Sequence, residues 1–141
     1  MIKGKLFLTM ALVAISFNSC KDKDDDPVEL VSGPGGNLTL VAKPQHHGQP
    51  ILNMASYPDS AMVKFNTQNF PGDNPALYDA IYIGANPGED FVRIAGIKPG
   101  KMYIFMAGWD STINQRVTGG IPFNTSQAAG ELVVVVPVTE I

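Results

Sequence analysis

The chain has two histidines, and they are adjacent, at positions 46 and 47. Histidine is a common metal ligand, because its neutral imidazole offers a nitrogen lone pair that suits copper, zinc or nickel. The spacing of the pair works against a shared ion, since neighbouring residues of a regular strand point to opposite faces. His46 and His47 therefore form a metal site only where the backbone is irregular, and we otherwise expect both to be exposed loop residues.

A second group of oxygen-bearing side chains runs from Trp109 to Asn114 and follows a predicted strand. Asp110 and Asn114 offer oxygen ligands of the kind that calcium takes, and Asp73 or Asp79 from another loop could join them. The same residue types form hydrogen-bonded turns without an ion, which is their commoner use. Trp109 is expected either to cover the core or to stand exposed as a stacking platform.

Aromatic residues are frequent in the segments expected as loops, and such residues are enriched in sites that bind proteins and sugars. The segment 66–79 is long for a loop with no strand of its own, which is typical of functional surface. We single out Phe70 and Tyr78 in it as candidate contacts. The segment 109–122 is the second predicted contact surface.

The chain lacks the sequence patterns of the common enzyme classes. It has no Gly-x-Ser-x-Gly nucleophile motif and no glycine-rich phosphate loop that leads into a helix. A serine triad would have to use His46 or His47. We therefore predict that the protein is not an enzyme and needs no cofactor.

The single cysteine, Cys20, follows a basic and then apolar N-terminal stretch. Lys3 and Lys5 precede the apolar run 6–15, an order that is typical of a secretory signal peptide. The run is too short to span a bilayer, which takes about 20 residues. Because exported cysteines usually pair as disulfides, a lone cysteine at this position needs another explanation.

Residues 17–20, Phe-Asn-Ser-Cys, resemble the lipobox of bacterial lipoproteins, in which the cysteine receives a diacylglycerol and becomes the new N-terminus. The resemblance implies a helical signal peptide over residues 1–19 and lipidation of Cys20. Attachment of this kind is stable, because each buried CH₂ of the acyl chains contributes about 0.8 kcal/mol.

Physically, the residues after Cys20 form a charged tether, over 20–29, that has little apolar surface to bury. The six that follow the cysteine directly are Lys21, Asp22, Lys23, Asp24, Asp25 and Asp26. A lysine and acidic residues in this position resemble the surface-export signal of Bacteroidetes lipoproteins. That resemblance implies display on the outer face of the outer membrane, with the periplasmic face as the alternative.

The net charge excludes one class of partner. Removal of residues 1–19 takes away two lysines and changes the formal net charge from −3 to −5. A mildly acidic protein lacks the basic surface that binds nucleic acid. The expected partners are therefore the membrane, through the lipid on Cys20, and an unknown extracellular or envelope protein or glycan.

Residues 30–141 are enough for a single domain. Short runs rich in Val, Ile, Tyr and Phe, bounded by Gly, Pro, Asn and Asp, predict its strands. These runs are 38–43, 61–65, 80–83, 91–94, 102–107, 115–118 and 132–138. No stretch after the signal peptide has the 3.6-residue period of a helix. We therefore predict an all-β fold, a single antiparallel Greek-key β-sandwich of about seven strands.

The stretch 91–105 resembles the core hairpin of transthyretin-like sandwich domains, which include carboxypeptidase regulatory-like domains and collagen-adhesin B-type repeats. An aliphatic strand, the sequence Gly96-Ile97-Lys98-Pro99-Gly100 and an aromatic strand with Tyr103 carry the resemblance. Gly48-Gln-Pro-Ile51 matches the motif that usually follows the first strand of these domains. The resemblance bears on the fold, because this sandwich hosts many functions.

Two further positions carry expectations about the chain path. Gly119 and Gly120, followed by Pro122, predict a corner. Pro137 lies inside the last predicted strand and predicts an edge position or a strand end, since proline cannot donate to a central ladder.

These features together predict a non-catalytic, lipid-anchored protein of the outer membrane that serves as an interaction or structural module at the cell surface. The alternative is a metal-binding envelope protein that uses His46 and His47.

Overall fold

The computed structural model describes residues 27–141. The predicted signal peptide over 1–19 and the proposed lipidation site Cys20 lie outside the described residues. So does the predicted export signal, which consists of Lys21, Asp22, Lys23, Asp24, Asp25 and Asp26.

Strands dominate the described chain, and the prediction of an all-β fold is confirmed. Each of the seven predicted runs overlaps an observed strand, and the eighth strand, β2, has only two residues. Among residues 27–141, no helix is long and apolar enough to cross a membrane. The elements are β1 (Gly33–His46), β2 (Gln49–Pro50), β3 (Ser60–Phe65), the 3-10 turn η1 (Pro75–Leu77), β4 (Ala80–Ile83), β5 (Val92–Lys98), β6 (Gly100–Asp110), β7 (Gln115–Thr125) and β8 (Ala129–Glu140).

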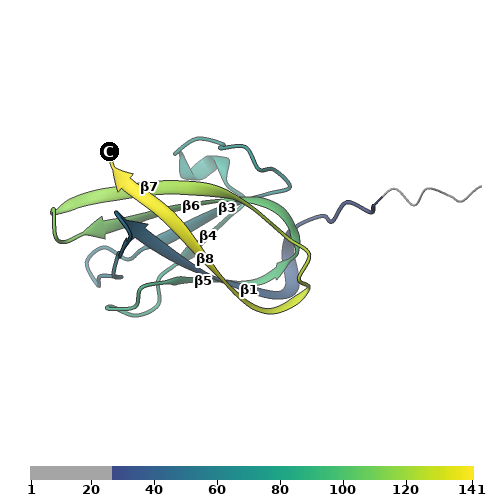
Figure 1. The fold of residues 1–141 in the computed structure, drawn as a ribbon, viewed down its shortest axis with the longest axis horizontal. Coiled ribbons are helices and arrows are strands. Elements are labelled where there is room, and N and C mark those ends of the chain that lie inside the picture. The colour runs from purple at the N-terminus through teal and green to yellow at the C-terminus, as the bar shows by residue number, and fades with distance from the viewer. Residues whose placement is uncertain (1–26) are drawn as a thin grey trace, which may run out of the picture.

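The strands form one curled sheet in the order β2-β1-β8-β7-β6-β3-β4, and β5 pairs with β1 (Figure 1). Strands β1 and β8 run parallel, from the pair Asn37–Ala129 to the pair His46–Val138. The other pairs are antiparallel. The prediction of a wholly antiparallel sandwich is therefore wrong in the direction of this pair, and the described residues form eight strands where about seven were expected.

The parallel pair arises because β8 does not fold back along β7. Only Thr139 and Glu140 of β8 pair with β7, while its earlier residues follow β1. Pro137 stands just before the β7 ladder begins, at an exposed position, where its missing N–H costs no hydrogen bond to β7. The predicted strand end at Pro137 is wrong, because Pro137 pairs with Gln45 of β1 and β8 continues to Glu140. The predicted edge applies only to its β7 side, where the ladder begins two residues later.

The two halves of the curled sheet enclose one apolar core. Strands β1, β5 and β8 contribute from one half, and β3, β6 and β7 from the other. The inward residues alternate along the strands, as expected where one face is buried. Fully buried members include Leu38, Leu40, Val63, Val92, Ile94, Met102, Ile104, Met106, Val117 and Val136.

The bend at Lys98–Gly100 links the two halves of the sheet. Strand β5, before the bend, pairs with β1, whereas β6, after it, pairs with β3 and β7. The two strands that resemble a core hairpin are therefore not paired with each other. The bend predicted from Pro99 and Gly100 is present, but it carries the chain across the core.

The predicted corner at Gly119 and Gly120 is also wrong, because both residues lie inside β7. A Cβ built on Gly119 would clash with the carbonyl oxygen of Pro137. Glycine is required there because the backbones of β7 and β8 approach each other closely. The segment 109–122, predicted as a contact loop, is instead a hairpin of β6 and β7 whose pairing starts at Asp110 and Gln115.

Candidate functional site

Three strands end at the same edge of the fold and bring three ionisable side chains together. His46 ends β1, Asp110 ends β6 and Glu140 ends β8. The parallel register sets His46 beside Val138, two residues before Glu140. Pairing of β7 with both β6 and β8 brings Asp110 to the same place.

His46 is enclosed between the two carboxylates. Its side chain is 5% exposed. The ring Nδ1 lies 2.7 Å from Oδ2 of Asp110, and Nε2 lies 2.6 Å from Oε2 of Glu140. The expectation of an exposed loop residue is therefore wrong for His46, because β1 extends to this position. It is correct for His47, which is exposed.

His46, Asp110 and Glu140 stabilise one another's charged forms. The hydrogen bond to Asp110 raises the pKa of His46, and Glu140 adds to the effect against the cost of burial. The pKa of Asp110 is lowered to about 2 by the Thr112 hydroxyl and then by His46. The pKa of Glu140 is lowered by its own backbone N–H and by His46. Because both ring nitrogens face carboxylate oxygens, the imidazolium is the form that satisfies both contacts.

His47 lies beside His46 because the backbone is irregular at this point. Its φ is 49°, in the left-handed region that L residues seldom adopt. The two ring centroids are 4.1 Å apart. One ligand atom from each of His46, His47 and Glu140 lies within 4.8 Å of the others. These residues and Asp110 line a cavity of about 250 Å³.

Asp79 does not lie near the calcium candidates at the end of β6. The Oδ1 of Asp110 accepts hydrogen bonds from the Thr112 N–H at 2.9 Å and hydroxyl at 2.6 Å, so it forms a turn. Asp79 accepts from the Phe65 N–H instead. Phe65 pairs with Met102, at the other end of β6, about 25 Å away at 3.3 Å per residue. The remaining candidates, Asp73 and Asn114, are exposed.

The aromatic candidates cover the outer face of the β3–β6 half. Phe70 lies 5.6 Å, between ring centroids, from both Tyr103 and Phe105 and is still 55% exposed. Tyr78 is buried beside Phe105 and donates its hydroxyl to the Gly72 carbonyl at 2.7 Å. Burial raises the pKa of Tyr78 to about 12. The loop 66–79 is thus partly a lid over a second small apolar cluster.

Trp109 lies apart from these aromatics. It is half-buried in β6, and its ring centroid is 5.5 Å from that of Tyr57. Trp109 was expected either to cover the core or to be an exposed stacking platform. It fits neither prediction fully, because its side chain is partly covered and partly exposed.

Asp59, just before β3, is a buried ionisable residue that the sequence analysis did not single out. Its exposed fraction is 0%, and neither carboxylate oxygen has a hydrogen-bond partner among the described residues. Burial raises its pKa from 3.8 to about 7. The backbone groups of Asp59 are hydrogen-bonded: its N–H donates to the Asn53 side chain, and its carbonyl accepts from the Gly84 N–H. An aspartate beside a proline and a serine gave no sign of burial in the sequence.

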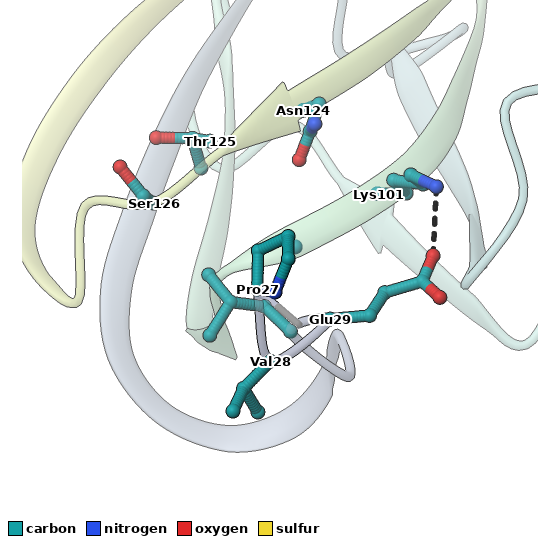
Figure 2. A pocket seen from close by; sticks show the side chains of 9 residues that line it. Pro27, Val28, Glu29, Lys101, Asn124, Thr125 and Ser126 are labelled. Carbon is teal, nitrogen blue, oxygen red and sulfur yellow. Dashed lines mark hydrogen bonds and ion pairs between the residues drawn. The ribbon is translucent and has the colours of Figure 1, made fainter. Parts of the chain in front are cut away.

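A further cavity, of about 690 Å³, lies where the chain enters the domain (Figure 2). Residues 27–30 form one wall, and Lys101, on β6, lies on the other side and bonds to Glu29 at 2.7 Å. Farther in, the Ser32 N–H donates to the Asn66 side chain at 2.8 Å, and the Asn66 N–H donates to the Ser32 hydroxyl at 2.9 Å. These bonds fix the point at which the described chain joins the fold.

The candidate site is therefore defined by its own geometry, a cluster of His46, His47, Asp110 and Glu140 at three strand ends. Comparison of the chain with protein-family models, with curated proteins and with solved structures finds no match.

Proposed function

We propose that this protein is a non-catalytic lipoprotein, anchored through Cys20 in the outer membrane and displayed at the cell surface. Its role there is to bind an extracellular or envelope protein or glycan. The observation that carries the anchoring part is the order of residues 1–26, a basic start, an apolar run, a single cysteine and an acidic segment.

The point of entry into the fold supports this arrangement. The acidic segment ends at Asp26, and the chain is held first by the ion pair of Glu29 with Lys101 and then by the hydrogen bonds of Ser32 with Asn66. A lipid on Cys20 would thus be separated from the domain by a short charged tether, which keeps the folded part off the bilayer surface.

The binding role is supported by apolar side chains that stay exposed on one side of the molecule. Ile81 and Ile83 of β4, which ends the sheet order, are 50% and 57% exposed. Ile81 pairs with Met62, and Met62 pairs with Phe105, which Phe70 covers. Exposed apolar residues that lie together are typical of contact surfaces.

The absence of catalysis in this proposal rests on the state of the buried histidine. Both ring nitrogens of His46 are engaged by carboxylates, so neither is free to accept a proton from a substrate. A relation to transthyretin-like sandwiches stays part of this proposal and is supported by the sequence of residues 91–105. Such a relation would have to accommodate both the parallel β1–β8 pair and the pairing of β5 and β6 with other strands rather than with each other.

Mass spectrometry of the mature protein tests the anchor. We expect an N-terminal Cys20 that carries a diacylglycerol thioether, and a Cys20→Ser variant that is neither lipidated nor retained in membranes. An unmodified thiol in the mature wild-type protein would overturn the proposal.

Protease treatment of intact cells tests the display. The wild-type domain should be digested, whereas a variant with the acidic residues 22 and 24–26 changed to asparagine should be protected inside the outer membrane. Protection of the wild-type protein would contradict surface display and support the periplasmic alternative.

A further inference from the structure

We propose that His46, His47 and Glu140 bind one divalent transition-metal ion of the zinc type. This site goes beyond the display role, because it gives the domain a ligand of defined chemistry. It rests on geometry that the three side chains already share, with one ligand atom of each within 4.8 Å of the other two.

The backbone at His47 allows the two histidines to share an ion. In a regular strand, His47 would point away from His46, and the pair could not share an ion. The φ of 49° at His47 belongs to the two-residue turn, His47–Gly48, that joins β1 to β2, and the centroids of the His46 and His47 rings are 4.1 Å apart. The irregular backbone that a shared site requires is present at the one position where it is needed.

A carboxylate, that of Asp110, holds the buried His46 ring from behind. The Nδ1–H of His46 donates to Asp110 at 2.7 Å, and Asp110 is held in turn by Thr112. Metal-binding histidines commonly donate their second ring N–H to a carboxylate, which fixes the ring and leaves the other nitrogen for the metal. In this structure Nε2 is that nitrogen, and it faces Glu140.

The site needs a small adjustment to accept an ion. Tetrahedral ligands about 2.0 Å from zinc stand about 3.3 Å apart, whereas Nε2 of His46 and Oε2 of Glu140 are 2.6 Å apart. Glu140 can make this movement, because its side chain is 48% exposed and it is the last residue of β8. The ion takes the place of the proton between the two atoms, and that proton leaves to solvent.

The donor set selects the class of metal. Two imidazole nitrogens and one carboxylate oxygen suit zinc, nickel and copper, whereas calcium and magnesium prefer oxygen alone. Three protein ligands leave the fourth tetrahedral position to a water molecule. The surrounding cavity of about 250 Å³ has room for that water.

Titration of the metal-free full-length protein in detergent with zinc chloride tests the site. Isothermal titration calorimetry should show one zinc ion per chain and no uptake of calcium. His47→Asn, which suits the left-handed backbone, and Glu140→Gln should each weaken binding at least tenfold, and the double variant should abolish it. Glu131→Gln, a matched control at the start of the same strand, should bind as the wild type does.

The proposal is overturned if the wild-type protein fails to bind zinc stoichiometrically or if the double variant binds it with wild-type affinity. Circular dichroism of each variant establishes that it is folded. Where a variant is not folded, a measurement on the wild-type protein alone still tests the site. In ¹H–¹⁵N spectra, zinc should shift the resonances of residues 46–48, 110 and 140 first, and saturating shifts confined to other residues would refute the site.

Discussion

Two buried polar positions in this domain are built in opposite ways. His46 lies between Asp110 and Glu140, and both of its ring nitrogens have a carboxylate partner. Asp59 is more deeply buried, and neither of its carboxylate oxygens has a hydrogen-bond partner in the described chain. The first position links three strand ends, whereas the second sits alone before one strand.

Both positions face the same cost, the loss of hydration on burial, but that cost leads to different protonation states at the two residues. An ionised group loses hydration on burial, and that loss is offset only where a partner of opposite charge or a hydrogen bond replaces the water. At His46 the partners favour the charged form, and its pKa is raised. At Asp59 nothing favours the charged form, so burial raises its pKa to about 7 and the neutral acid is preferred.

The largest loss of stability is expected when His46, which pairs with two carboxylates, is replaced. His46→Ala leaves Asp110 and Glu140 without their shared partner, and the thermal midpoint of the metal-free protein should fall by on the order of 10 °C. His47→Asn is the matched control, because His47 is exposed and adjacent. Equal midpoints for the two variants would mean that the enclosed histidine does not hold the strand ends together.

The next largest change in stability is expected from substitution of Asp59, and its size depends on pH. Because its folded pKa of about 7 lies above the unfolded value of 3.8, the folded state binds the extra proton between these values. The contribution of Asp59 to stability therefore falls as pH rises from about 4 to 7 and stays low above that range. Asp59→Asn should remove this slope and be more stable than the wild type at pH 8 by a few kcal/mol.

Denaturant unfolding at pH 4 and pH 8 measures the difference between the two proteins. Asp73→Asn serves as the control, because Asp73 is exposed. A wild type and an Asp59→Asn variant that respond to pH in parallel would show that Asp59 has a partner that the described structure lacks.

A smaller loss of stability is expected from substitution of Gly108, which lies against Asp59. A Cβ on Gly108 would stand 2.6 Å from Oδ1 of Asp59 and 2.9 Å from a methyl carbon of Ile51. Gly108→Ala should lower the free energy of unfolding by about 1–3 kcal/mol through overpacking. In an Asp59→Ala background the loss should be smaller, since one of the two clashes is gone; a double-mutant cycle without coupling would contradict the contact.

The smallest effect is expected from a charge pair that is exposed. Arg93 and Glu131 pair across β5, β1 and β8 with side chains that are 49% and 56% exposed. Glu131→Gln should change the free energy of unfolding by less than about 0.5 kcal/mol, because water already solvates both groups. A larger loss would mean that enclosure is not what distinguishes the His46 cluster.

The strands could be predicted from the sequence because their signal is local. The runs 61–65 and 80–83 are short, rich in apolar residues and bounded by turn residues, and they lie within β3 and coincide with β4. The buried face of β4 could not be predicted in this way, because its four residues are all apolar and the two isoleucines are the exposed ones. The same reasoning failed at Gly119, where glycine serves the contact with Pro137 inside a strand. A glycine pair looks the same in a turn and at a close backbone approach.

The candidate site could be predicted only in part. His46 and His47 were recognised from their residue type, but Glu140 was not, because its approach depends on the parallel pairing of β1 with β8. Such pairing joins residues about 90 positions apart, and no local pattern specifies it. Asp110 was recognised as a ligand-type residue, yet its partner is a histidine on another strand.

The enclosure of His46 is the central structural claim, and its ring protons test it most directly. In the metal-free full-length protein near neutral pH, long-range ¹H–¹⁵N spectra should show two imidazole N–H protons on His46, both protected from exchange with water. His47 should show none that is protected. A single, rapidly exchanging N–H on His46 would contradict the structure, because it would place at least one of the two carboxylates away from the ring.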